Sequence, residues 1–316
     1  MTSVIICTYN RSDSLKTTLD SLAQMTVPPD LSWELIVVDN NSNDRTREVV
    51  EEFAATSGLN VRYDFEGRQG KSYALNRGIE GAKGEIIAFT DDDVAVDKFW
   101  LFHLTEVFER YGCLGVGGRV VAVWDAAKPS WLQEEGPYAL ASAIVSFDWG
   151  EEVCDAVEPP IGANMAFKKE VFAEHGVFRT DLGKMGNGRM IICEDFDFGR
   201  RLLNKKQKVV YTPKAVVYHP VAKERIRKAY FRSWYFNWGR ARVRREGLPK
   251  RAVYYFGVPR FFFRTITENF IRWITTLEPK RRFYHELQAY LVAGMIVETR
   301  RLSAETRRVV EECVSA

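Results

Sequence analysis

Residues 85–93 read EIIAFTDDD, a short β-rich apolar run that ends in three consecutive aspartates. Three comparable runs precede it along the chain: SVIICT (Ser3 to Thr8), WELIVVD (Trp33 to Asp39) and VRYDF (Val61 to Phe65). The segments between the runs carry apolar residues at helical spacing, so predicted strands alternate with predicted helices. This alternation indicates an α/β fold with a mostly parallel sheet that helices cover on both faces.

Three of these runs lead directly into polar residues. The clusters are Thr8-Tyr9-Asn10-Arg11, Asp39-Asn40-Asn41-Ser42 and Asp91-Asp92-Asp93. Open α/β sheets bind ligands beyond the carboxyl ends of their strands, at the point where the strand order reverses. We therefore expect the three clusters to face one crevice.

The three adjacent aspartates, Asp91, Asp92 and Asp93, would repel one another and raise each other's pKa values unless a cation lies among them. Carboxylates favour Mg²⁺ or Mn²⁺, ions that also bind the phosphates of a substrate. His219 ends a later apolar run and could complete the coordination or contact a diphosphate. The ordinary alternative is a solvated acidic turn that caps a helix beginning near Asp97.

The segment EGRQGKSYALNRG, residues 66–78, lacks the spacing of a Walker A loop, because Phe65 stands where the first glycine belongs. Gly70 and Lys71 nevertheless open a predicted helix. The backbone N–H groups at that helix start and the lysine ammonium could bind a diphosphate.

Two further acidic positions are candidates for chemistry. Asp39 could accept a hydrogen bond from a base N–H or a ribose hydroxyl, unless it only belongs to a polar loop. Glu194 and Asp195 begin another predicted helix, where either could be a general base that takes a proton from an attacking hydroxyl. Favourable interaction of carboxylates with the helix dipole explains the pair equally well.

Six motifs taken together closely resemble the family-2 glycosyltransferases in order and spacing over roughly residues 2–220. They are TYNR (8–11), VVDNNSND (37–44), GKSYALNRG (70–78), FTDDD (89–93), GANMAF (162–167) and CEDFDF (193–198). The resemblance implies a GT-A fold, a nucleotide-diphosphate sugar donor, Mn²⁺ or Mg²⁺ at an Asp-x-Asp motif, and inversion at the anomeric carbon.

The resemblance also implies roles for individual residues. The nucleotide-sugar pocket would comprise Thr8, Tyr9, Arg11, Asp39, Asn41, Gly70, Lys71, Asn76, Asp91, Asp92, Gly162, Ala163 and Asn164. Within it, Asp39 would recognise the base, most commonly uracil. The metal ligands would be Asp91, Asp93 and His219, with Asp92 an alternative because three aspartates leave the register open. Asp195 would be the catalytic base, with Glu194 beside it.

Charge divides the chain into two parts. Residues 1–222 contain 24 Lys and Arg against 33 Asp and Glu, whereas residues 223–316 contain 21 against 9, no Asp, and 17 of the 41 aromatic residues. We therefore expect a GT-A catalytic domain at 1–222 and a basic, aromatic-rich helical extension at 223–316. Amphipathic helices of this composition predict attachment to an anionic membrane surface. Alternatives are an ordinary small helical core, a homo-oligomer interface, and nucleic-acid binding, which no recognised module supports.

The remaining sequence features bear on location. The longest apolar run of the extension, Ala289 to Val297, has nine residues, whereas a membrane-spanning helix needs about twenty. No segment resembles a secretory signal, and the five cysteines include no CxxC pair, so reduced thiols are expected. We expect a cytoplasmic protein, peripheral on the inner face of the cell membrane.

The predicted function is transfer of a sugar, most often UDP-linked in this family, to a hydroxyl of a glycan or lipid-linked acceptor. One alternative is an inactive sugar-nucleotide-binding or membrane scaffold protein. Another is a nucleotidyltransferase acting on a sugar phosphate, which would carry a glycine-rich signature where this chain has TYNR. The chain has no QxxRW motif, which argues against processive polymerisation.

Overall fold

The structure, a computed structural model, describes residues 1–184 and 190–315. Its contacts divide the chain into two compact units. The first, here called the sheet unit, comprises Met1–Asp125, Ile144–Arg189 and Glu194–Val221. The second, here called the helical unit, comprises Ala126–Ala143, Met190–Cys193 and Ala222–Ala316. The helical unit therefore includes two short segments that precede residue 222 in the sequence.

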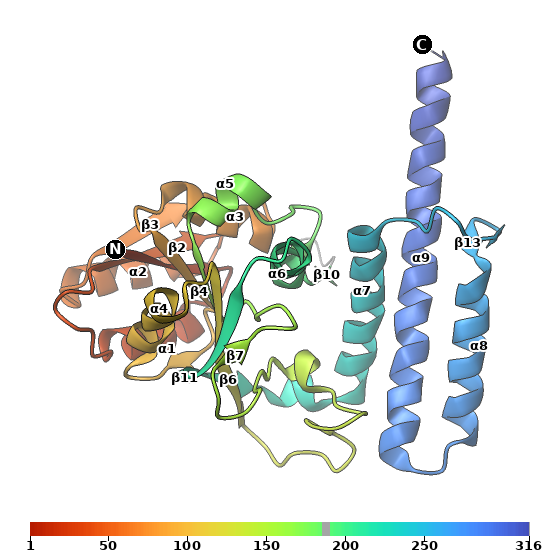
Figure 1. The fold of residues 1–316 in the computed structure, drawn as a ribbon, viewed down its shortest axis with the longest axis horizontal. Coiled ribbons are helices and arrows are strands. Elements are labelled where there is room, and N and C mark those ends of the chain that lie inside the picture. The colour runs from red at the N-terminus through yellow and green to blue at the C-terminus, as the bar shows by residue number, and fades with distance from the viewer. Residues whose placement is uncertain (185–189, 316) are drawn as a thin grey trace. The chain divides into compact units, whose positions relative to one another are not determined.

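A nine-stranded sheet is the centre of the sheet unit, counted over the described residues (Figure 1). Its order is β3 (Val61–Phe65), β2 (Trp33–Asp39), β1 (Thr2–Thr8), β4 (Ile86–Thr90), β8 (Asn164–Lys168), β6 (Gly115–Trp124), β11 (Val209–Val221) and β5 (Ala95–Val96), with β7 (Cys154–Asp155) paired to β11. Strands β1 to β4 are parallel, and β8 is antiparallel to both of its neighbours. The predicted mostly parallel sheet is confirmed.

The strand order reverses at β1, which has β2 on one side and β4 on the other. Thr8 is the partner of Asp39 in the β1–β2 register, and Ile6 is the partner of Thr90 in the β1–β4 register. The loops that leave these three strands therefore begin side by side at one edge of the sheet. That edge is the expected binding position of an open α/β sheet.

Helices cover both faces of the sheet, as predicted. Helices α1 (Ser12–Ala23), α2 (Thr46–Thr56) and α4 (Trp100–Tyr111) pack on one face, and α3 (Lys71–Gly81), α5 (Glu170–His175) and α6 (Glu194–Asn204) on the other. Alternate residues of each central strand enter the two cores: Val4 and Ile6 join the first, and Ile5 the second. The sheet is thus buried on both faces, which explains its continuous apolar runs.

Several short elements complete the chain. They are η1 (Ala141–Ile144), β9 (Gly183–Lys184), β10 (Met190–Ile191), η2 (Lys223–Ile226), β12 (Tyr254–Tyr255) and β13 (Val258–Pro259).

Three helices form most of the helical unit: α7 (Lys228–Glu246), α8 (Arg260–Thr275) and α9 (Pro279–Ser315). Helix α9 packs against both α7 and α8 (Figure 1). A Cβ atom at Gly239 of α7 would lie 1.9 Å from the carbonyl oxygen of Leu291, and one at Gly294 of α9 would lie 1.9 Å from that of Phe236. The α7–α9 crossing is therefore close enough to require glycine at both positions.

A buried ion-pair network also joins α7 to α9. Glu298 is fully buried, and its carboxylate accepts hydrogen bonds from Arg240 Nε at 2.8 Å and Arg244 Nε at 2.6 Å. Burial opposes ionisation, but the two arginine hydrogen bonds outweigh it and lower the pKa of Glu298. In the described part of the chain, we find no helix with the length and apolarity that a membrane crossing requires.

Candidate active site at the carboxyl ends of the strands

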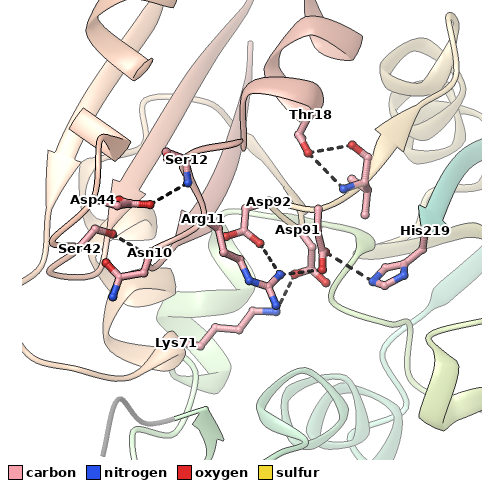
Figure 2. A network of polar contacts seen from close by, with 12 residues as sticks. Asn10, Arg11, Ser12, Thr18, Ser42, Asp44, Lys71, Asp91, Asp92 and His219 are labelled. Carbon is pink, nitrogen blue, oxygen red and sulfur yellow. Dashed lines mark hydrogen bonds and ion pairs between the residues drawn. The ribbon is translucent and has the colours of Figure 1, made fainter. Parts of the chain in front are cut away.

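Asp91 and Asp92, the first two of the three aspartates that follow β4, lie beside two cations of the protein, Lys71 and Arg11 (Figure 2). Lys71 Nζ, at the start of α3, is 2.7 Å from Asp91 Oδ1. Arg11 Nη1, in the loop after β1, is 3.2 Å from Asp92 Oδ1 and 2.6 Å from Asp93 Oδ2. These ion pairs balance part of the negative charge that the sequence places at this point.

The local environment shifts the pKa values of Asp91 and Asp92 in opposite directions. Burial raises the pKa of Asp92 to about 6, with Asp93 adding to the shift and Arg11 opposing it. Burial acts in the same direction on Asp91, but the Lys71 ammonium outweighs it and holds the pKa of Asp91 well below its ordinary value. Asp91 is therefore an anion whose oxygens are available to a second cation.

Asp91, Asp93 and His219 form a group that could hold a metal ion. One ligand atom from each residue lies within 4.8 Å of the other two. His219 comes from β11 and is almost fully buried, with its Nε2 atom 3.5 Å from Asp93 Oδ1. Two carboxylate oxygens and one imidazole nitrogen are a suitable donor set for Mn²⁺ or Mg²⁺. The structure thus brings together the three residues predicted as ligands.

The loops after β1 and β2 are tied together by side chains. Asn10 has a positive φ of 51°; its N–H donates to Ser42 Oγ, and its Oδ1 accepts from Asn43 N–H. The N–H of Ser12 donates to Asp44 Oδ2 (Figure 2). The predicted site residues do not include Asn10. Its residue type is a signal that could have identified it, because asparagine adopts left-handed backbone conformations more readily than most residues.

Asp39, at the end of β2, already accepts two hydrogen bonds. Ser42 N–H donates to its Oδ1 at 2.8 Å, and the Tyr63 hydroxyl donates to its Oδ2 at 2.9 Å. Each carboxylate oxygen has a second lone pair, so the group retains capacity to accept from a ligand N–H. The two protein bonds fix the direction in which that capacity points.

Asn40 is a second residue that sequence reasoning missed. Its Nδ2 atom donates to the carbonyls of Glu66 and Arg68, and its Oδ1 atom accepts from Gly70 N–H at 2.7 Å. A buried amide thus holds the 66–70 loop against the end of β2. The polar cluster after β2 gave a signal for this residue, but its partners lie 26 to 30 positions further along the chain.

Gly70 immediately precedes α3 and has a φ of 146°, a conformation that side chains disfavour. A Cβ atom here would also lie 3.1 Å from the Tyr73 ring. This backbone conformation places Lys71 at the first position of the helix, where its ammonium reaches Asp91.

The acidic pair of α6 lies next to the segment that precedes β8. Asp195 Oδ2 accepts from Gly162 N–H at 2.7 Å, and Asp195 Oδ1 accepts from the adjacent Phe196 N–H at 2.7 Å. Glu194 is buried, and its Oε1 is 3.7 Å from Lys71 Nζ. Burial raises the pKa of Glu194, with Asp195 adding to the shift and Lys71 opposing it. Lys71 therefore lies between the aspartate group and the Glu194–Asp195 pair.

Two predicted pocket residues have both amide ends occupied by the protein. Asn76 donates to the carbonyl of Phe178 and accepts from its N–H. Asn164 is fully buried; it accepts from the indole of Trp100 and donates to the carbonyls of Arg119 and Ala215. These contacts give both asparagines a structural role, so we do not include them among the residues proposed to bind ligand.

The other predicted pocket residues lie at the loop ends. Tyr9 and Asn41 are exposed, and Thr8 is buried at the end of β1. Ala163 is buried, and its carbonyl accepts from the Thr90 hydroxyl at 2.8 Å. Ala163 therefore joins the segment before β8 to the end of β4, from which the aspartates follow.

Comparison with known proteins extends this description. Residues 3–176 match the family model described as Glycosyl transferase family 2. A glucosyl-dolichyl phosphate glucuronosyltransferase of Haloferax volcanii is 29% identical over 220 residues, which are 69% of this chain and 68% of that protein. The succinoglycan biosynthesis protein ExoM of Rhizobium meliloti is 28% identical over 243 residues, which are 76% of this chain and 73% of that protein.

A solved structure has a similar fold. The mannosyltransferase PcManGT of Pyrobaculum calidifontis, in complex with GDP-Man and Mn²⁺, aligns with a TM-score of 0.56 at 20% sequence identity. The alignment covers 98% of this chain and 75% of that chain. At this identity the likeness establishes the fold, which is of the GT-A type.

Proposed function

Because this chain belongs to glycosyl transferase family 2, we propose that it transfers a sugar from a nucleotide-diphosphate donor to an acceptor hydroxyl, with inversion at the anomeric carbon. One observation carries the proposal: Asp91, Asp93 and His219, the candidate metal ligands, lie beside Lys71, which also approaches Glu194, the neighbour of Asp195. Groups suited to a leaving diphosphate and a candidate base are thus linked by one lysine.

Asp91, Asp93 and His219 would hold Mn²⁺ or Mg²⁺. When bound, such an ion stabilises the charge that develops on a departing diphosphate. Three features of the protein could supply further positive potential to the diphosphate oxygens. The Lys71 ammonium and the N–H groups at the start of α3 are suited to bind phosphate oxygens, and Arg11 adds a guanidinium from the loop after β1.

Asp195 is the proposed general base. Its two protein hydrogen bonds orient the carboxylate, and each oxygen keeps a lone pair for the acceptor hydroxyl proton. Removal of that proton generates the nucleophile, which attacks the anomeric carbon on the face opposite the diphosphate. A single displacement of this kind inverts the anomeric configuration and needs no covalent enzyme intermediate.

We propose a UDP-linked donor and a glycan or lipid-linked acceptor. The remaining acceptor capacity of Asp39 suits the imide N–H of uracil. The relatives include a protein named for transfer involving a glucosyl-dolichyl phosphate and one named for succinoglycan biosynthesis. These names support an acceptor in polysaccharide or glycolipid assembly.

Calorimetric titration tests the donor. We expect UDP to bind in the presence of Mn²⁺ and much more weakly after chelation, and a panel of sugar nucleotides should then identify the hydrolysed donor. Preferential binding of GDP would contradict the choice of uracil. Release of pyrophosphate from a nucleoside triphosphate would instead indicate nucleotidyl transfer.

Turnover by an Asp195→Asn variant tests the base. We expect kcat to fall by about 10²- to 10⁴-fold, because the acceptor proton loses its receiver, while UDP affinity stays within twofold. The variant Asp155→Asn, at an exposed position on β7, is the matched control. Wild-type turnover by Asp195→Asn, or a product of retained configuration by NMR, would refute the proposed mechanism.

A further inference from the structure

Among the described residues, helix α8 packs mainly against one other helix of the helical unit. It packs along α9, and α7 packs against α9 as well (Figure 1). Among the sixteen residues of α8, all of them described, only Phe262 is buried. Most of the α8 surface is therefore turned away from any core.

The exposed surface of α8 and its flanks is strongly apolar. Phe270, Ile271 and Ile274 are each about half exposed, and Leu277, just after the helix, is 95% exposed. Phe270 and Ile274 are four residues apart and so share one face of the helix. Before the helix, Phe256 at the turn between β12 and β13 is 89% exposed. Exposed apolar side chains thus lie on the β12–β13 hairpin and along the C-terminal half of α8. Several large apolar side chains exposed in one segment indicate an interaction surface.

The same segment is strongly basic. Residues 250–282 contain eight cations, all exposed, against two carboxylates, Glu268 and Glu278. The cations are Lys250, Arg251, Arg260, Arg264, Arg272, Lys280, Arg281 and Arg282.

Helix α7 carries a similar mixture of basic and aromatic residues but uses it differently. Phe231 and Tyr235 are buried, and Phe231 contacts the Trp131 ring edge-on. Arg240 and Arg244 bind the buried Glu298. These residues of α7 therefore stabilise the helical unit. In α8, by contrast, Phe270 and the three arginines are exposed, and of these arginines Arg264 pairs with Glu268 on the same helix.

We propose that α8 and the β12–β13 hairpin lie in the interface of an anionic membrane. Phe256, Ile274 and Leu277 enter the boundary of the acyl chains, and the surrounding arginines contact lipid phosphates. A bilayer supplies both an apolar layer and negative charge, which matches both properties of this surface. Helix α8, whose residues are all described, does not have the length and apolarity of a membrane span.

Two other partners match this surface less well than a membrane does. A symmetric dimer through the same face would place the cations of two copies against each other. A nucleic acid would match the cations, but base stacking uses aromatic rings and gives no role to Ile271, Ile274 or Leu277.

Vesicle co-sedimentation of the full chain tests the proposal. We expect sedimentation with vesicles of phosphatidylcholine mixed with phosphatidylglycerol, little sedimentation with phosphatidylcholine alone, and weakening as salt increases. The combined variant Arg260→Gln, Arg264→Gln, Arg272→Gln should bind the anionic vesicles on the order of 100-fold more weakly at low salt. Ile274→Ser with Leu277→Ser should lose binding at every salt concentration.

Matched controls come from the sheet unit. Val157 is 76% exposed, and Arg45 and Arg47 have largely exposed side chains. Val157→Ser, and Arg45→Gln with Arg47→Gln, should sediment like the wild type. Circular dichroism checks that every variant is folded.

Three results would overturn the proposal. One is equal sedimentation of the α8 variants and the wild type. Another is a concentration-dependent dimer in analytical ultracentrifugation that Ile274→Ser with Leu277→Ser abolishes, which would make this face a self-interface. The third is vesicle binding that is absent while RNA or DNA binding depends on the same arginines. None of these results depends on whether the sheet unit transfers a sugar.

Discussion

Lys71 connects the two acidic groups of the site. Its ammonium is 2.7 Å from Asp91 and 3.7 Å from Glu194, and these attractions raise the pKa of Lys71 against the effect of burial. The lysine therefore stays charged throughout the range in which enzymes are assayed. A cation at this position keeps two mostly buried carboxylates compatible with the folded state.

Removal of the Lys71 charge should lower the stability of the protein, and the size of the loss should depend on whether Mn²⁺ is present. In Lys71→Met, Asp91 and Glu194 lose their partly buried partner, so we expect the free energy of unfolding in chelator to fall by about 3 kcal/mol. Mn²⁺ should restore part of this loss, because an ion at Asp91 replaces the missing charge. Urea denaturation with and without Mn²⁺ measures both effects.

Lys16→Met, at an exposed position of α1, is the matched control and should change stability by less than about 0.5 kcal/mol. If Lys71→Met were as stable as this control in chelator, the lysine would not be balancing the carboxylates.

At the scale of the element, the start of α3 depends on backbone conformation. Gly70 combines a φ of 146° with a hydrogen bond from its N–H to Asn40 Oδ1. The helix therefore begins where the 66–70 loop is fastened to the end of β2. This arrangement directs the first N–H groups of α3 and the Lys71 side chain toward the aspartates.

Gly70→Ala should impair both stability and nucleotide binding. A Cβ atom requires a disfavoured conformation and approaches the Tyr73 ring at 3.1 Å. We expect a loss of about 1–3 kcal/mol in stability and at least tenfold weaker UDP binding, because the start of α3 shifts. Thermal unfolding and calorimetry provide the two measurements.

Gly58 offers a matched control, since its φ is also positive, at 67°, and open space surrounds its Cβ position. Gly58→Ala should lower stability by about 1 kcal/mol and leave UDP affinity unchanged. Equal nucleotide affinity in the two variants would mean that the conformation at Gly70 does not position the site.

At the scale of the whole molecule, two units of different construction share one chain. A sheet with two apolar cores holds the sheet unit together. The α7–α9 pair of the helical unit relies on a close glycine crossing and a buried network of Glu298 with Arg240 and Arg244. Acid should therefore lower the stability of the helical unit by protonating the Glu298 carboxylate.

The helical unit should lose stability as pH falls below about 4.5, the ordinary pKa of a glutamate. The pKa of Glu298 is lower in the folded state, so its contribution is complete above 4.5 and disappears as pH falls through the folded value. The free energy of unfolding of Glu298→Gln should be about 3 kcal/mol lower than that of the wild type at neutral pH. This difference should become smaller in acid. Hydrogen exchange of α7 and α9 amides as a function of pH measures this effect.

The exposed Glu305→Gln, a change at an i,i+4 pair with Arg301, serves as the control and should differ from wild type by at most about 0.5 kcal/mol. A constant difference between Glu298→Gln and wild type from neutral pH to strong acid would contradict the proposed linkage.

Local sequence patterns were sufficient to predict much of the fold of the sheet unit. Strand periodicity, helical spacing and the polar residues after each strand predicted the order of elements in the sheet unit and the edge at which its loops gather. These features depend on neighbouring residues and on general rules of parallel sheets, so no contact map is needed to predict them. The grouping of Asp91 and Asp93 with His219 followed from the same rules together with the family resemblance.

Contacts between distant residues required the tertiary structure. Asn76 and Asn164 match the motif as well as Lys71 does, yet their amides bind Phe178, Trp100, Arg119 and Ala215. Likewise, α7 and α8 are similar in composition, but only packing against α9 shows which of them buries its aromatics. Burial and hydrogen-bond partners depend on which surfaces meet after folding, and composition does not encode that information locally.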